Sequence, residues 1–137
     1  MNFRQANHFD FPEIIEILEE INLDMEDLEP AQFVVGVLND TVVGVGRIRS
    51  HDSCFELCSI GVLEEHRGKG FGKGIVQLLL KNCNEQKSYV VTDIPAFFEK
   101  FGFAITNEFP DEIAAKRQMC ISELGCNQAQ VLELKPR

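Results

Sequence analysis

The sequence of 137 residues predicts an α/β fold in which one mixed, twisted sheet carries helices on both faces. Segments rich in β-branched residues alternate along the chain with segments of helical periodicity, in a β-α-α-β-β-β-α-β-α-β-α-β order. No repeat and no Pro/Gly/Ser-rich linker divides the chain, and its hydrophobic content of 45% is ordinary for a globular protein. We therefore expect residues 1–137 to form a single domain with about six or seven strands in its sheet.

The N-terminal quarter predicts one strand and two helices. Residues 1–6 form a short candidate strand, and residues 11–21 place apolar side chains at helical spacing. Asp10 is expected to cap this helix and Pro12 suits its first turn. Residues 22–28 are expected to form a second short helix.

Residues 32–50 contain two β-rich runs that meet at Asn39 and Asp40. Both residue types tolerate positive φ, so the pattern predicts a tight hairpin. Glycines inside these strands indicate bulges or a close approach of another element: Gly36, Gly44 and Gly46. A further strand is expected over residues 54–62, with one face buried.

The C-terminal half continues the alternation of helices and strands. After a glycine-rich turn, apolar residues at helical spacing predict a helix through Ile75, Leu78, Leu79 and Cys83. The later elements are a mostly apolar strand at 88–92, a helix at 94–103 ended by Gly102, a helix at 110–119 and a strand at 129–134.

Composition excludes several classes of function. The net charge of -9, from 13 basic and 22 acidic residues, disfavours binding to nucleic acid and to anionic membranes. No apolar run approaches the roughly 20 residues that span a bilayer, and no secretory signal is visible, so we expect a cytoplasmic protein. The five cysteines are odd in number and contain no C-x-x-C pair, which favours reduced thiols and no metal site.

The segment EEHRGKGFGKGIVQLLL, Glu64 to Leu80, predicts an anion-binding turn at the start of a helix. It fits neither the dinucleotide fingerprint, which requires a glycine where Ile75 stands, nor the P-loop, which requires Ser or Thr where Gly74 stands. The pattern that remains is R-x-x-G-x-G, formed by Arg67, Gly70 and Gly72. Bare backbone amides, the positive end of a helix dipole and nearby cations together suit a diphosphate. The alternative is a turn that binds nothing.

The longer segment ELCSIGVLEEHRGKGFGKGIVQLLL, Glu56 to Leu80, resembles the central motif of the GCN5-related N-acetyltransferase (GNAT) superfamily, and Phe97–Phe103, FFEKFGF, is similar to the signature that closes the same core. The resemblance implies acetyl-CoA as the cosubstrate, with the pyrophosphate on the turn and the pantetheine along the preceding strand. The cofactor-binding residues that it implies are Ile60, Gly61, Val62, Arg67, Gly68, Lys69, Gly70, Phe71, Gly72 and Lys73.

Transfer of an acetyl group to an amine requires a base. Glu56 stands where better-known members of the superfamily carry a glutamate base; the alternative is a glutamate facing solvent at a strand edge. His51 and Asp52 are further candidates for the base. The tyrosine that commonly protonates the thiolate is replaced by Phe98, so the acid is unassigned. Tyr89 is expected to pack in the core, and Cys120 is more readily read as structural than as an acid.

The acceptor is predicted from a patchier resemblance. Residues 90–103 and 108–120, with a second late cysteine, look similar to N-acetylglutamate synthases and to N-acetyltransferases of arsenic-resistance operons. This implies a small amine acceptor such as an amino acid, for which Arg47, Arg49, Lys116 and Arg117 are candidate carboxylate ligands. A polyamine or a protein lysine is the alternative acceptor. A catalytically lapsed CoA-binding module and a plain interaction domain are the rival functions, and a homodimer is compatible with the sequence.

Overall fold

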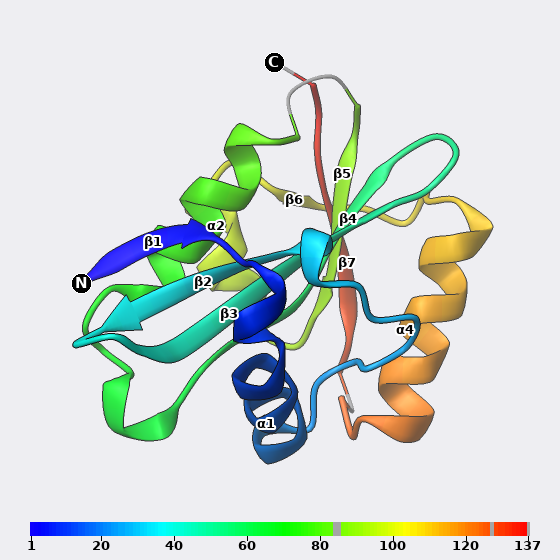
Figure 1. Ribbon diagram of the computed structural model, residues 1–137. Helices are drawn as coiled ribbons and strands as arrows, with labels where there is room; N and C mark the ends of the chain where they lie inside the picture. Colours follow the sequence, from blue (N-terminus) through cyan, green and yellow to red (C-terminus); the bar gives the residue numbers. More distant parts are fainter. Residues whose placement is uncertain (84–85, 127, 137) are drawn as a thin grey trace. The chain divides into compact units, whose positions relative to one another are not determined.

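The chain, seen in a computed structural model, is described over residues 1–83, 86–126 and 128–136. Its seven strands form one mixed sheet in the order β1-β2-β3-β4-β5-β7-β6, which confirms the predicted α/β class (Figure 1). The chain divides into two compact units, Met1–Ile48 with Cys58–Asn82 and Arg49–Leu57 with Cys83–Arg137. Strand β4 (Phe55–Val62) contributes to both units.

The first unit contains the antiparallel strands and two of the longer helices. Its elements are β1 (Asn2–Gln5), α1 (Phe11–Ile21), β2 (Phe33–Leu38), β3 (Thr41–Ser50, which ends in the second unit), α2 (Phe71–Lys81) and the short 3₁₀ helices η1 (His8–Asp10), η2 (Pro30–Gln32) and η3 (Glu64–His66). Strand β2 pairs antiparallel with β1 and with β3. The hairpin between β2 and β3 turns at Asn39 and Asp40, whose φ values of 51° and 63° confirm the predicted tight turn.

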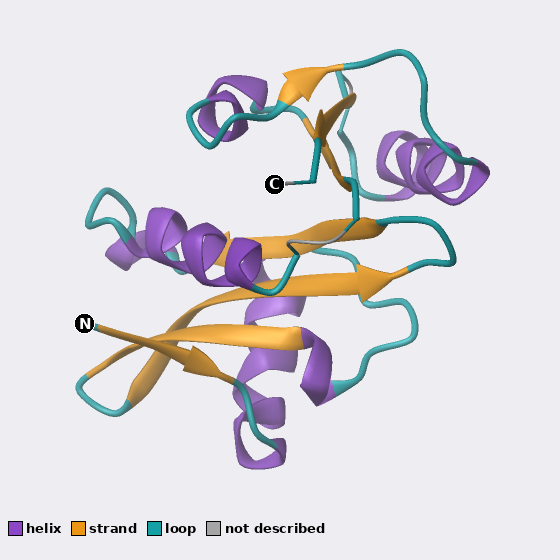
Figure 2. Cartoon of the chain, turned by 90° about the horizontal axis from the view of Figure 1, so that it is seen from above, coloured by secondary structure: helices purple, strands orange, loops and turns teal. Residues whose placement is uncertain are grey.

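Helices α1 and α2 pack on opposite faces of these strands, as Figures 1 and 2 show. The α1 face buries a hydrophobic core made of Ala6, Ile14, Ile17, Leu18, Phe33, Val35, Val37, Val42 and Val45. On the other face the strands carry glycines instead, and a Cβ at Gly46 would collide with Ile75 of α2. The predicted close approach at the strand glycines is therefore confirmed: the missing side chains let α2 lie directly on the sheet.

The second unit contains β5 (Ser88–Thr92), α3 (Pro95–Glu99), β6 (Ala104–Ile105), α4 (Asp111–Glu123) and β7 (Gln130–Leu134). Strand β7 pairs antiparallel with β5 and with β6. Helix α4 packs on one face through Ile113, against Tyr89 and Val131. Gly102 lies in the turn after α3 with a φ of +99°, and a Cβ there would lie 3.3 Å from Leu134 of β7.

One local expectation is wrong and one is right only in part. Residues 22–28 form no helix, because the carbonyl groups of Glu26 and Asp27 accept hydrogen bonds from the side chain of Arg47 instead of from the amides of a helix. Asp10 is the N-cap residue of α1, as predicted, but its side chain makes no capping hydrogen bond to that helix. Its carboxylate instead accepts from the amide of Asn7 and from both terminal nitrogens of Arg4, so it closes the preceding turn η1.

Candidate active site

The glycine-rich turn lies entirely in the first unit, between β4 and α2. The chain leaves β4 through the short helix η3, and the Nε of Arg67 then donates a hydrogen bond to the carbonyl of Val62 at 2.9 Å. Gly68 and Gly70 have φ values of +79° and +91°. Since L side chains rarely adopt that region, these two glycines allow the reversal that carries the chain from the sheet into the helix.

Helix α2 begins without a side-chain cap. Its N-cap is Gly70, and the amide of Gly74 makes the first bond back into the helix, to the Gly70 carbonyl at 3.1 Å. The amides of Phe71, Gly72 and Lys73 therefore precede the first intrahelical bond. They lie at the positive end of the helix dipole, and the side chains of Lys69 and Lys73 are exposed beside them.

This turn fits a diphosphate on the structure's own geometry. A Cβ at Gly68 or Gly70 would meet no protein atom within 4 Å, so the protein itself does not require glycine there for space. A bulky anion lying against the backbone would require it, because a side chain would hold the phosphate away from the amides. The positive φ values give glycine a second, purely conformational role at the same positions.

Strand β4 bends at Ser59, which has a φ of +49°. The Oγ of Ser59 donates to the carbonyl of Asp24 at 2.8 Å and stabilises this unusual conformation. In the second unit β4 pairs with β5 through Phe55–Leu57. The segment Ile60–Val62 follows the bend. Gly61 also has a packing role there, because a Cβ on it would lie 2.8 Å from Leu23.

Glu56 lies in the second unit, at the centre of a buried ionic cluster. Its side chain is 1% exposed, with Oε1 3.0 Å from Nε2 of His51 and Oε2 3.0 Å from Nζ of Lys116. The structure thus brings together a residue predicted as the base, one predicted as its substitute and one predicted as a carboxylate ligand. Asp52, the remaining candidate base, is exposed in the loop between β3 and β4.

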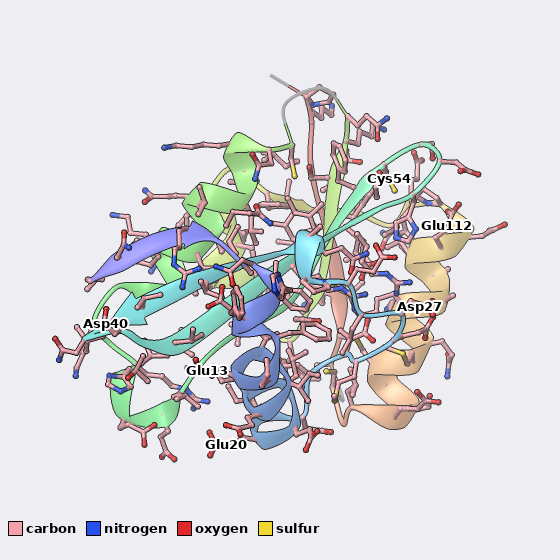
Figure 3. All side chains as sticks on the ribbon, viewed as in Figure 1. Glu13, Glu20, Asp27, Asp40, Cys54 and Glu112 are labelled. Atoms are coloured by element: carbon pink, nitrogen blue, oxygen red, sulfur yellow. The ribbon has the colours of Figure 1, made fainter. Side chains whose placement is uncertain are left out.

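The thiols beside this cluster are held in the neutral form. Burial, with smaller contributions from Glu112 and Glu56, raises the pKa of Cys54 to about 11, and Figure 3 shows Cys54 and Glu112 close together. Burial likewise raises the pKa of Cys120 to about 12, partly offset by Lys116. A thiol of such weak acidity is a poor source of protons at neutral pH, which favours a structural role for Cys120.

No aromatic hydroxyl is placed to act as the acid, either at Phe98, which stands in the usual place of the tyrosine, or at Tyr89. Phe98 is 4% exposed and packs edge-to-face on Phe103, with ring centroids 5.9 Å apart. Tyr89 is buried opposite Glu133 of β7. Burial, and then Glu133, raises the pKa of Tyr89. Both rings belong to the core of the second unit.

The predicted carboxylate ligands are largely engaged in structural contacts. Arg47 is 0% exposed; its Nε donates to Gln32 at 2.8 Å, and its Nη2 donates to the carbonyls of Glu26 and Asp27 at 2.6 and 2.8 Å. The Nε of Arg117 donates to the carbonyl of Ala129 at 3.0 Å. Arg49 is half-buried at the end of β3. Sequence patterns missed the anchoring role of Arg47, since its partners come from a segment predicted as helix.

In the described part of the chain, no group of three or more His, Cys, Asp or Glu side chains could hold a metal ion. Within the same residues, no helix is long and apolar enough to cross a membrane. The grouping of His51, Glu56 and Lys116 had no sequence signal beyond the individual residue types, because the partners lie on three different elements.

Comparison with known proteins places these features in context. The family model of the acetyltransferase (GNAT) family matches residues 2–103. An alpha-tubulin N-acetyltransferase from Schistosoma japonicum is 33% identical over an alignment of 86 residues; the match covers 53% of this chain and only 32% of that protein.

Solved structures share the fold at low sequence identity. Rv2747 from Mycobacterium tuberculosis, in complex with CoA and NLQ, is 19% identical with a TM-score of 0.82, and the match covers 100% of both chains. N-acetylglutamate synthase from Neisseria gonorrhoeae, in complex with coenzyme A and N-acetyl-glutamate, is 16% identical with a TM-score of 0.77 over 99% of this chain and 35% of that one.

Proposed function

Because the chain belongs to the GNAT family of acetyltransferases, we propose that it transfers the acetyl group of acetyl-CoA to the amine of a small acceptor that carries a carboxylate. The observation that carries this proposal is the uncapped start of α2, where the amides of Phe71, Gly72 and Lys73 precede the first intrahelical bond beside two exposed lysines. Such a turn fits the diphosphate of a coenzyme.

The first unit would bind the cosubstrate. The amides of Phe71, Gly72 and Lys73 would hold the diphosphate, with Lys69 and Lys73 balancing its charge. The segment Ile60–Val62 would pair with the pantetheine arm as an added strand. Bound there, acetyl-CoA supplies an activated thioester; a strand amide in this segment would stabilise the charge that develops on its oxygen.

The reaction also needs a base, because an amine is mostly protonated at neutral pH and must lose a proton to attack. The Glu56 carboxylate contacts an imidazole through one oxygen and an ammonium through the other, and this polar setting supports Glu56 as part of the base. With Phe98 in the core, the leaving thiolate would take its proton from water.

The proposal also specifies the chemical class of the acceptor. The structure of N-acetylglutamate synthase in complex with N-acetyl-glutamate supports a small amino acid. Arg47 and Arg49 are the carboxylate ligands that the sequence predicts for this role, and the hydrogen bonds that Arg47 makes to Gln32, Glu26 and Asp27 weigh against Arg47. A protein lysine is a second candidate, favoured by the alpha-tubulin N-acetyltransferase relative.

Two measurements test the proposal. Acetyl-CoA at a hundred times its Kd should stabilise the protein by about 2.7 kcal/mol, visible as a rise in Tm. A screen of amino acids, polyamines and lysine peptides should then release CoA thiol with one class of acceptor. Absence of any thermal shift would favour the interaction domain, and a shift without thiol release from any acceptor would favour the lapsed CoA-binding module.

A further inference from the structure

Two free thiols meet at the C-terminal end of α4, inside the second unit. Cys120 lies in the last turn of the helix, which ends at Glu123, and Cys126 follows in the connection to β7. The side chains of Cys120 and Cys126 are hydrogen-bonded to each other. Two thiols in such contact can be joined by a disulfide without a large movement of the backbone.

The backbone brings the two cysteines together through its own hydrogen bonds. The chain turns at Gly125, which has a φ of +75°, and the amide of Cys126 donates to the carbonyl of Cys120 at 3.0 Å. The amide of Ala129 then donates to the carbonyl of Cys126 at 3.2 Å. The carbonyl of Ala129 accepts from the Nε of Arg117 at 3.0 Å. Cys126 is therefore held between the end of α4 and the residue that leads into β7.

The two thiols differ in access to solvent. Cys120 is 4% exposed, whereas Cys126 is partly exposed. Burial raises the pKa of Cys120 to about 12, so this thiol keeps its proton at neutral pH and is a poor first nucleophile. An oxidant from solvent therefore reacts first with Cys126. Contact then compensates for the weak acidity of Cys120, because a nucleophile held against its target reacts as if at very high concentration.

We propose that Cys120 and Cys126 are a redox-sensitive pair, which a small-molecule disulfide converts reversibly into an intramolecular disulfide. The thiolate of Cys126 attacks one sulfur of the small disulfide, forms a mixed disulfide and expels one small thiolate. Cys120 then attacks the sulfur of Cys126, the mixed bond breaks and the second small thiolate leaves. The protons of the two protein thiols pass to the two released thiolates. The protein loses two electrons, and the small disulfide gains them.

The bond would close a loop over residues 120–126 and join the end of α4 to the segment that leads into β7. A cross-link restricts the unfolded chain, and closure of a short loop raises Tm by about 5–10 °C in a domain of this size. Lys116 lies one turn before Cys120 on the same helix. The bond would therefore also stabilise the helix that carries the ammonium in contact with Glu56. The proposed bond does not depend on acetyl transfer.

The first test counts thiols in the full chain. Reduced protein is treated with oxidised glutathione and denatured, and its free thiols are alkylated. We expect the wild type to lose two of its five thiols and retain no glutathione, and dithiothreitol should restore both. A glutamate-specific protease cuts after Glu123, so the peptides that carry Cys120 and Cys126 should stay linked until they are reduced. Five free thiols, unlinked peptides or a link between another pair would overturn the proposal.

Single variants test the order of the two steps. Cys120→Ala should retain one glutathione on Cys126, because the thiol that releases it is missing. Cys126→Ser should keep all of its remaining thiols under the same conditions. Cys54→Ala removes a buried thiol of the same unit and is the matched control, which should form the bond as the wild type does. A glutathione adduct that persists on wild-type Cys126 would show that Cys120 does not attack it, and would refute the pair.

The melting temperature shows whether the bond fits the native fold. The oxidised wild type should melt about 5–10 °C above the reduced protein, and the same treatment should leave the Tm of Cys126→Ser unchanged. A lower Tm in the oxidised wild type would show that the bond distorts the fold, and would overturn the proposal. If a cysteine variant did not fold, the linked peptides of the wild type would still decide.

Discussion

Substitution of Gly70 by alanine is the sharpest test of the turn before α2. Gly70 has a φ of +91°, and a Cβ there would meet no protein atom within 4 Å. Gly125 is its matched control: it has a φ of +75° and the same lack of protein neighbours, but it lies in the second unit after α4. The two substitutions therefore impose similar backbone strain and differ in what lies in front of the new methyl group.

The expected changes follow from two contributions to the free energy, the backbone strain and the loss of a hydrogen bond to the diphosphate. An alanine held in the left-handed region costs about 1–2 kcal/mol, which for a chain of this size lowers Tm by about 3–7 °C. Both variants should show this loss. At Gly70 the methyl group should also separate the diphosphate from a backbone amide. The loss of one hydrogen bond to a charged group, about 1.5–3 kcal/mol, weakens binding by about 10- to 100-fold.

Isothermal titration of acetyl-CoA into the three proteins provides the assay, with Tm measured on the same samples. We expect Gly125→Ala to bind as the wild type does. Gly70→Ala should bind about 10- to 100-fold more weakly, which is the effect of losing one hydrogen bond to a charged group. Equal affinity in all three proteins would refute the placement of the diphosphate. If both variants bound acetyl-CoA more weakly by the same factor, backbone strain alone would account for the loss of affinity.

Three further predictions concern the buried polar groups. The pKa of Asp10 is lowered, chiefly by its hydrogen bonds from an arginine, so its contribution to stability exists above the ordinary value of 3.8 and is lost as the pH falls below it. In denaturant unfolding, Asp10→Asn should therefore cost about 1–2 kcal/mol at neutral pH. A difference between the wild type and this variant that persists in acid would contradict the prediction. Arg47→Met should lower the free energy of unfolding by about 2–4 kcal/mol, since it removes the donor of three hydrogen bonds, to Gln32, Glu26 and Asp27, whereas a rise in the acceptor's KM with unchanged stability would show that Arg47 binds substrate. In thiol titrations of the folded protein only Cys126 should react rapidly, because the other four cysteines are buried; fast labelling of more than one thiol would contradict the described packing.

Local sequence patterns were sufficient wherever one short segment decides its own structure. The hairpin depends on two adjacent residues that tolerate positive φ, and the turn into α2 depends on glycines followed at once by apolar residues at helical spacing. The class of the sheet could be expected too, because alternation of strands and helices restricts the chain to few topologies. For this reason the fold class and the glycine turn at the start of α2 were predictable without coordinates.

Tertiary contacts decided what the local patterns could not. Residues 22–28 have helical composition, yet a buried arginine from β3 takes their carbonyl groups, and the hydrogen bonds that a helix would make are lost. Glu56 reads as a strand-edge carboxylate until a histidine from the preceding loop and a lysine from α4 contact it. The sequence by itself determined which residue types are present and how each segment begins and ends; only the folded chain decided which of those charges are buried together, because burial and pairing depend on partners many residues away.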